Sequence, residues 1–119
     1  MSRILVVDDE PDLRYIMRRV FERAGHEVID AGHGAAALEV VSGPLPDLVV
    51  TDMMMPVMDG AELIRRLRAD PRTARIPILA ATSNAQLAAG ADAVLTKPYQ
   101  PSQLLAAATA LLARKADPR

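Results

Sequence analysis

Short runs of apolar residues recur along the chain and predict buried strands. Residues 4–7 and 48–50 are unbroken runs rich in β-branched side chains, a pattern typical of strands covered on both faces of a parallel sheet. Residues 78–80 and 93–95 show a weaker form of the same pattern, and residues 26–30 are a plausible further strand. The chain is therefore expected to contain five strands.

Between the strands lie segments whose apolar positions repeat at helical spacing. The clearest begins near Pro11, which suits a first helical turn, and ends before Gly25. The arginines between its apolar positions, Arg14 among them, are expected to face water. The apolar face of this helix is expected to comprise Leu13, Ile16, Met17, Val20 and Phe21.

Further helices are predicted at residues 35–41, at residues 61–68 and from Pro101 onward. Residues 114–119 are expected to form a frayed tail. Strands and helices thus alternate along the chain, which predicts an α/β fold with a doubly wound parallel sheet. Ligands of such folds bind outside the carboxyl ends of the strands, so functional residues are expected there.

The connection between the fourth and fifth predicted strands is short. Residues 83–92 are only ten residues, the lower limit for a helix that links two parallel strands. If residues 84–89 form that helix, it is about 9 Å long, barely more than one turn. We expect the fourth helix to be short or missing and the sheet beside it to be left open.

Composition narrows the class of protein. The 119 residues fit one domain over residues 1–119, and 50% hydrophobic with 24% charged residues is a globular balance. A net charge of −1 offers no broad positive field, so direct binding of nucleic acid is not expected. The absence of cysteine fits a cytoplasmic location, and no apolar stretch is long enough to span a membrane.

Acidic side chains stand where two of the predicted strands end. Asp8 and Asp9 follow the first strand, and Asp52 closes the third. Because the carboxyl ends of parallel strands meet at one edge of a sheet, these three carboxylates are expected to converge. Crowded carboxylates need a compensating cation, and an all-oxygen site without histidine or cysteine suits Mg²⁺.

Two further groups follow the fourth and fifth strands. Thr82 adds a hydroxyl and Lys97 a positive charge, and both suit a phosphoryl oxygen. Together with the acids, the run DMMMPVMDG at residues 52–60 and the pair Lys97-Pro98, they make the sequence resemble the CheY-like receiver domains of response regulators. The resemblance covers nearly the whole chain and implies a flavodoxin-like five-stranded sheet in the order 2-1-3-4-5.

The resemblance also implies a role for each of these residues. Asp52 would be the phosphoacceptor, and Thr82 and Lys97 would bind the phosphoryl oxygens. The phosphoryl group would come from a sensor histidine kinase or a histidine phosphotransfer protein, and a downstream protein effector would read it. A receiver is no enzyme and only assists its own phosphorylation and dephosphorylation. A Mg²⁺ or Mn²⁺ ion would be held by Asp8 through water, by Asp9 and Asp52, and by the backbone carbonyl of Met54.

Two positions depart from the pattern of the family. Receivers usually carry an aromatic residue three positions before the lysine, where it couples to the threonine during activation, but this chain has Val94. The switch region, which comprises Val94 and Pro98, is therefore expected to lack the usual aromatic switch. Met54 places a bulky apolar group near the expected path of an attacking water, which predicts slow dephosphorylation.

Three other functions are alternatives to the receiver. A phosphate-independent, receiver-like protein-binding module is favoured by Val94 and the short fourth helix, but the intact set of acids, threonine and lysine argues against it. A Mg²⁺-dependent aspartyl phosphohydrolase would need a second acid where Met54 stands. A flavodoxin-like cofactor carrier would need a phosphate-binding loop in place of the acidic residues 8–11.

Overall fold

The molecule has three layers, a parallel sheet between two pairs of helices. The computed structural model describes residues 2–116. Its strands are β1 (Arg3–Val7), β2 (Glu27–Ala31), β3 (Leu48–Asp52), β4 (Ile78–Thr82) and β5 (Ala93–Thr96). All are parallel and lie in the order β2-β1-β3-β4-β5, which confirms the predicted order.

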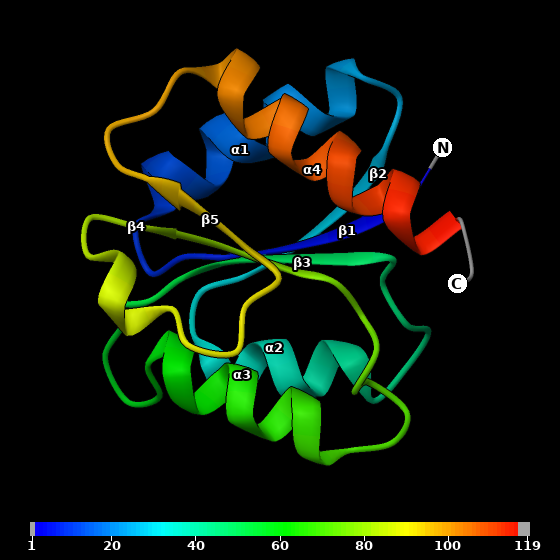
Figure 1. The fold of residues 1–119 in the computed structure, drawn as a ribbon, viewed down its shortest axis with the longest axis vertical. Helices are drawn as coiled ribbons and strands as arrows, with labels where there is room; N and C mark the ends of the chain where they lie inside the picture. The colour runs from blue at the N-terminus through cyan, green and yellow to red at the C-terminus, as the bar shows by residue number, and fades with distance from the viewer. Residues whose placement is uncertain (1, 117–119) are drawn as a thin grey trace.

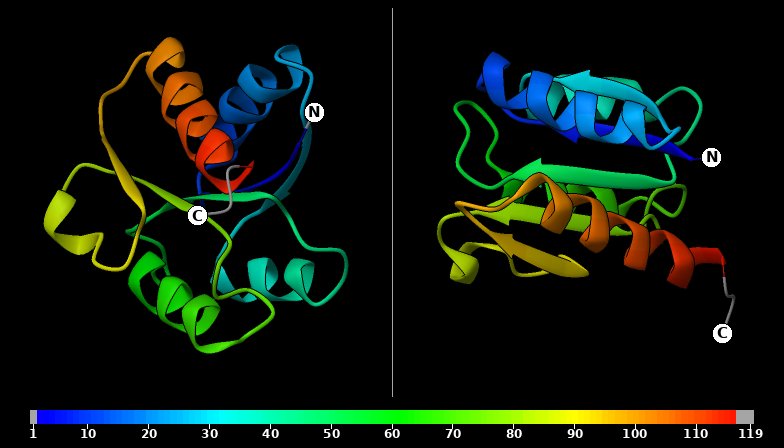
Figure 2. Two further views of the ribbon diagram at one scale, coloured as in Figure 1. Left: turned by 45° about the vertical axis from the view of Figure 1, so that its right-hand side comes forward. Right: turned by 90° about the horizontal axis from the view of Figure 1, so that it is seen from above.

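The helices cover both faces of the sheet. They are α1 (Pro11–Arg23), α2 (Gly34–Val41), α3 (Gly60–Ala69) and α4 (Pro101–Ala116), with a single 3₁₀ turn, η1 (Ala85–Leu87), between β4 and β5. Helices α1 and α4 lie side by side on one face, and α2 and α3 lie on the other (Figures 1 and 2). Within residues 2–116, no helix is long and apolar enough to cross a membrane.

Local sequence explains where the helices begin. Pro11 starts α1, where its missing N–H has no helical partner to lose. At α2, the ring nitrogen Nδ1 of His33 accepts a hydrogen bond from the Ala36 N–H at 3.1 Å. At α3, Asp59 Oδ1 accepts from the Glu62 N–H at 2.9 Å. Both caps satisfy backbone donors that the first helical turn leaves unpaired.

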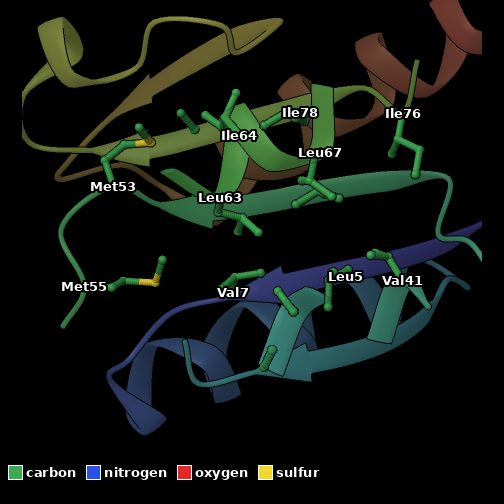
Figure 3. Packing of buried hydrophobic residues seen from close by; sticks show 14 of the residues in the cluster. Leu5, Val7, Val41, Met53, Met55, Leu63, Ile64, Leu67, Ile76 and Ile78 are labelled. Carbon is green, nitrogen blue, oxygen red and sulfur yellow. The ribbon is translucent and has the colours of Figure 1, made fainter. Parts of the chain in front are cut away.

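The core consists of two halves, one on each face of the sheet. Alternate residues of a central strand point to opposite faces. Leu5 and Val49 therefore join the half beneath α2 and α3, shown in Figure 3, whereas Ile4 and Val50 join the half beneath α1 and α4. This double burial explains the unbroken apolar runs in the sequence. It also fixes the strand ends, which carry the polar residues described below.

Two predictions about the helices were wrong in detail. Ile16 is 49% exposed, so it does not belong to the buried face of α1 that Met17 and Phe21 form. Residues 114–116 continue α4 and are not a frayed tail. The sequence that ends this helix consists of residue types with high helix propensity, which explains the extension. The other residues of the predicted tail, 117–119, lie outside the described residues.

The connection between β4 and β5 contains only η1. The expectation of a short or missing fourth helix is therefore confirmed, although residues 84–89 contain only the 3₁₀ turn at 85–87 and no α-helix. Ala88 is buried against the α2–α3 half of the core, but Leu87 and Val94 of β5 stay exposed. One turn is too small to cover the face of β5.

An arginine of α3 holds this short connection in place. Arg68 donates hydrogen bonds to the backbone carbonyls of Ile76 (2.9 Å) and Gly90 (3.1 Å) and pairs with the Asp92 carboxylate at 2.7 Å. Asp92 Oδ2 also accepts from the Ile78 N–H at 2.7 Å. Arg68 therefore joins α3 to the beginnings of β4 and β5.

We predict that Arg68→Ala lowers the free energy of unfolding by about 2 kcal/mol, because it leaves several partly buried acceptors without a donor. Urea denaturation followed by circular dichroism measures this change. Arg66→Ala is the matched control, since Arg66 on the same helix only pairs with Glu62 at the surface and should cost less than about 0.5 kcal/mol. Equal changes in the two variants would contradict the role of Arg68.

Candidate functional site

Three carboxylates meet at the carboxyl edge of the sheet. Asp8 follows β1 directly, and Asp52 is the last residue of β3, the neighbouring strand. One carboxylate oxygen from each of Asp8, Asp9 and Asp52 lies within 4.8 Å of the others. Asp8 and Asp52 are buried, and Asp9 is more exposed. The parallel sheet thus brings acids from distant parts of the sequence into one cluster.

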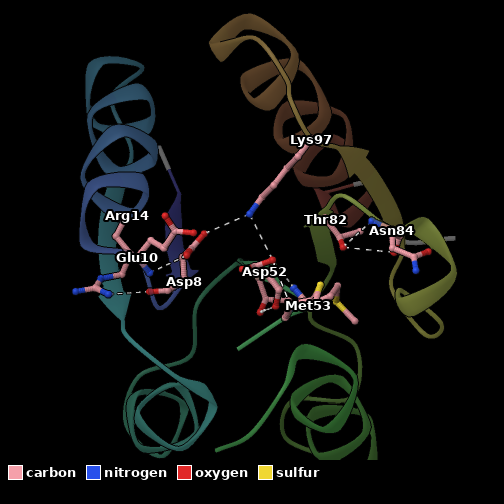
Figure 4. A network of polar contacts seen from close by, with 10 residues as sticks. Asp8, Glu10, Arg14, Asp52, Met53, Thr82, Asn84 and Lys97 are labelled. Carbon is pink, nitrogen blue, oxygen red and sulfur yellow. Dashed lines mark hydrogen bonds and ion pairs between the residues drawn. The ribbon is translucent and has the colours of Figure 1, made fainter. Parts of the chain in front are cut away.

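Asp8 is held by three hydrogen bonds. Its N–H donates to the Ala31 carbonyl at the end of β2 (3.2 Å), and its Oδ1 accepts from the Glu10 N–H (2.9 Å). Its backbone carbonyl accepts from Arg14 Nη1 at 2.7 Å (Figure 4). The prediction that Arg14 faces water was therefore wrong: the side chain is 22% exposed and folds back from α1 onto the loop after β1.

Lys97 lies between the two buried acids. Its Nζ is 3.4 Å from Asp52 Oδ1 and 3.8 Å from Asp8 Oδ2 (Figure 4). The residue follows β5, and its N–H donates to the Thr82 carbonyl at 2.9 Å, which continues the pairing of β5 with β4. Lys97 thus pairs with two of the three clustered carboxylates.

The Asp52 carboxylate is oriented by its own loop. Its Oδ1 accepts a hydrogen bond from the Met53 N–H at 2.8 Å. Gly60, the first residue of α3, packs against the same backbone, because a Cβ there would lie 2.5 Å from the Asp52 carbonyl oxygen. Between them, Val57 has a φ of 70° and is 95% exposed, a strained conformation for a β-branched residue. The loop is thus folded tightly beneath the acid.

Thr82 reaches the same edge from β4, beside the strand that ends with Asp52. Its hydroxyl accepts a hydrogen bond from the Asn84 N–H at 3.1 Å, so it is tied to its own loop. Of the residues expected in the switch region, Val94 is 41% exposed on β5, and Pro98 is exposed after a cis Lys97-Pro98 bond.

An apolar cleft of about 490 Å³ lies beside the loop that follows Asp52. Met54, whose side chain is 63% exposed, forms one wall, and Leu87 of η1 forms another. The cleft lies where η1 replaces a longer helix. Its lining residues are Met53, Met54, Met55, Pro56, Asp59, Ala61 and Leu87.

Burial and mutual repulsion shape the electrostatics. Burial raises the pKa of the Asp8 carboxyl, and the negative charges of Asp52 and Asp9 raise it further. The Glu10 N–H and the Lys97 ammonium act in the opposite direction but do not cancel these effects. Burial also raises the pKa of the Tyr99 hydroxyl, and Asp8 and Asp52 add to this rise.

The donor set fits a hard divalent cation. The clustered ligand atoms are all carboxylate oxygens, and Lys97 alone cannot balance three negative charges. Neither histidine nor cysteine belongs to the cluster, which disfavours softer metals. An ion such as Mg²⁺ or Mn²⁺ would relieve the repulsion among the carboxylates, which adds to the effect of burial on the pKa of Asp8.

Arg14 and Tyr99 were not predicted from the sequence as neighbours of the site. Arg14 shares α1 with three other arginines, and helical periodicity does not distinguish them. The sequence held one indication of this contact. Arg14 is four residues after Glu10, so one helical turn brings its side chain back beside the acidic loop. For Tyr99, the only indication in the sequence was its position two residues after Lys97.

Comparisons with known proteins point to one family. A family model described as "Response regulator receiver domain" matches residues 4–109. The DNA-binding dual master transcriptional regulator RpaA of Synechocystis is 38% identical, over 96% of this chain and 50% of the relative. The chain spans about half the length of the first curated relatives it matches.

Solved structures agree with this match. The chemotaxis response regulator CheY4 of Vibrio cholerae has a TM-score of 0.88 at 31% identity, covering 93% of this chain and 98% of that one. The receiver domain of the sensor histidine kinase PA1611 of Pseudomonas aeruginosa has a TM-score of 0.88 at 27% identity, covering 94% and 98%. The structure of the latter has a magnesium ion coordinated in its active site cleft.

We predict that Asp8→Asn raises the melting temperature of the metal-free protein at neutral pH. Because the pKa of Asp8 is raised, the folded state binds this proton more tightly than the unfolded chain, and ionisation destabilises the fold as pH rises through the folded pKa. Asparagine removes the charge and keeps an acceptor for the Glu10 N–H. Thermal unfolding in EDTA measures the difference.

The stabilisation by Asp8→Asn should disappear below the usual carboxyl pKa of 3.8, where Asp8 is protonated in both states. Asp59→Asn is the control, because Asp59 is exposed, lies outside the cluster and caps α3 in a way that asparagine can replace. A lower melting temperature for Asp8→Asn at neutral pH would refute the interpretation.

Proposed function

Because the chain belongs to the family of response regulator receiver domains of two-component systems, we propose that it accepts a phosphoryl group on Asp52 and acts through the partners that bind the altered surface. The observation that carries the proposal is the geometry around Asp52. Its carboxylate lies 3.4 Å from the Lys97 ammonium and within a cluster of acids that fits a divalent cation. These are the groups that phosphoryl transfer to a carboxylate requires.

The transfer step uses one oxygen of Asp52. Oδ1 is held by the Met53 N–H, whereas Oδ2 accepts no hydrogen bond from residues 2–116 and is available to attack. An Asp52 oxygen forms a bond to phosphorus while the bond from phosphorus to the donor nitrogen or oxygen breaks, and the electron pair leaves with the donor. Bound Mg²⁺ would offset the repulsion between the carboxylate and the incoming phosphoryl group.

Two side chains complete the binding of the phosphoryl group. Lys97, which pairs with both buried acids, turns its ammonium to a phosphoryl oxygen. The Thr82 hydroxyl donates to another phosphoryl oxygen, and its acceptor bond with the Asn84 N–H links this event to η1. Phosphorylation therefore changes the charge of the acidic cluster and pulls on the loop that forms a wall of the apolar cleft.

The partners follow from the same chemistry. A sensor histidine kinase or a histidine phosphotransfer protein supplies the phosphoryl group, and a downstream protein effector reads it. Residues 1–119 act as one receiver domain in the cytoplasm. RpaA is DNA-binding, but the match covers only half of that protein, and the net charge of −1 of this chain does not favour direct contact with nucleic acid.

A second function has specific observations in its favour. Val94 stands where receivers usually carry an aromatic residue that couples to the threonine. The 3₁₀ turn η1 stands where a helix would link β4 to β5. Both changes are compatible with a protein-binding module that works without phosphate. The cluster of acids with Lys97 favours the phosphorylated receiver, because a simple binding module has no need to bury unbalanced charges.

We predict a single phosphoryl adduct, seen by intact mass spectrometry, when the protein is incubated with acetyl phosphate and Mg²⁺. The adduct should be absent in Asp52→Asn and in EDTA, because the nucleophile or the compensating cation is missing. Asp59→Asn should be phosphorylated as the wild type is, since Asp59 lies outside the cluster. An unmodified wild-type protein that still binds Mg²⁺ would refute the proposal and support the phosphate-independent module.

We also predict that phospho-Asp52 hydrolyses slowly. The Met54 side chain is exposed beside Asp52, where it excludes an attacking water and offers no group to orient one. Met54→Asn should shorten the lifetime of the adduct, and Val57→Asn, an exposed change in the same loop, should not. The decay of the adduct mass after removal of acetyl phosphate measures both. A wild-type lifetime of seconds would contradict the prediction.

A further inference from the structure

Arg14 makes a bridge that phosphoryl transfer itself does not require. Its Nη1 donates to the backbone carbonyl of Asp8 at 2.7 Å, and its Nε lies 3.6 Å from Asp30 Oδ2 at the end of β2. The guanidinium also passes close to Gly32, where a Cβ would lie 3.3 Å from Nη1. One side chain thus joins the acidic loop, α1 and β2.

The bond to the Asp8 carbonyl fixes the peptide that joins the two acids. A peptide group is planar, so the position of its oxygen sets the plane and the direction in which Asp9 leaves it. Asp8 is already held through its N–H by Ala31 and through Oδ1 by Glu10. Arg14 removes the remaining freedom of the loop without taking a carboxylate oxygen.

The charge of Arg14 does not explain its placement. A positive group beside three acids would weaken the binding of a cation, yet the guanidinium contacts a carbonyl, and Asp30 balances its charge. The fork of donors on an arginine can reach both the carbonyl and Asp30, which a single ammonium group cannot do. The arrangement of the donors of Arg14, and not its charge, therefore explains its place beside the acids.

We propose that Arg14 is a positioning residue for the divalent cation, holding the Asp8–Asp9 peptide so that both carboxylates face Asp52. The inference rests on the metal site proposed above. Groups that orient metal ligands through hydrogen bonds change metal affinity when they are removed, even though they never touch the ion. Arg14 acts on the acids in this way.

Arg18 provides a matched control on the same helix. It also carries one positive charge, and its Nη1 lies 3.5 Å from Asp30 Oδ1 while its Nε pairs with Glu22. It makes no hydrogen bond to the loop of Asp8 and Asp9. Arg14→Gln and Arg18→Gln therefore remove the same charge from the same surface, and only Arg14→Gln releases the Asp8 carbonyl.

The test is direct metal binding by the full chain, without a phosphodonor. Water-proton relaxation reports Mn²⁺ binding, and competition gives the Mg²⁺ affinity. Arg14→Gln should weaken Mg²⁺ binding about tenfold, whereas Arg18→Gln should stay within about twofold of the wild type. Arg14→Lys, which keeps the charge but loses the fork, should recover only part of the affinity.

The sign of the effect separates position from charge. If Arg14 acted only through its charge, Arg14→Gln would bind Mg²⁺ more tightly than the wild type. Unchanged or tighter binding, or an equal loss in Arg18→Gln, would overturn the inference. If Arg14→Gln fails to fold, Arg14→Lys decides the matter, because it keeps the charge and loses only the fork, so weaker Mg²⁺ binding than in the wild type would report position alone.

These outcomes also separate the inference from the proposed function. A wild-type protein that binds Mg²⁺ but accepts no phosphoryl group would refute the proposed function and leave the role of Arg14 intact. A wild-type protein that binds no Mg²⁺ would refute the metal site and the inference together.

Discussion

Mutual repulsion among three carboxylates at one edge of the sheet is the constraint on which the local structure depends. Asp8 and Asp52 are buried, where water screens their charges poorly. Among residues 2–114, whose side chains the structure describes, Lys97 is the one cation that pairs with both. Burial raises the pKa of the Asp8 carboxyl, and the charges of Asp52 and Asp9 raise it further although Lys97 acts in the opposite direction. The site is therefore held in a state that favours the arrival of another cation, and the surrounding bonds restrain acids that would otherwise move apart.

The acids and Lys97 are held in place by the sheet and by hydrogen bonds and ion pairs outside the site. Strands β1 and β3 are buried on both faces, so the acids at their ends are carried by strands that lie within the core. Lys97 has a less secure support, because β5 is an edge strand that η1 hardly covers. Arg68 compensates by joining the beginnings of β4 and β5 to α3. The fold thus positions a polar site mainly through contacts that lie outside it.

The sequence was sufficient for features that depend on periodicity and on topology. Unbroken apolar runs located the strands, and the rule that parallel strands end at one edge placed Asp8, Asp52 and Lys97 together. The length of residues 83–92 predicted the missing helix. The sequence could not show which of several similar residues makes a given contact. Arg14 and Arg18 are alike in the sequence, yet only Arg14 reaches the acidic loop, because only that position faces the end of β1.

The short connection also bears on how the chain folds. Pairing β3 with β4 closes a segment of 25 residues, 53–77, whereas pairing β4 with β5 closes only the ten residues 83–92. The shorter loop loses about 0.8 kcal/mol less entropy on closure, since this cost grows with the logarithm of loop length. The edge strand that carries Lys97 can therefore add to β4 without waiting for a helix to form, which makes this the most local of the pairings that β4 makes in the sheet.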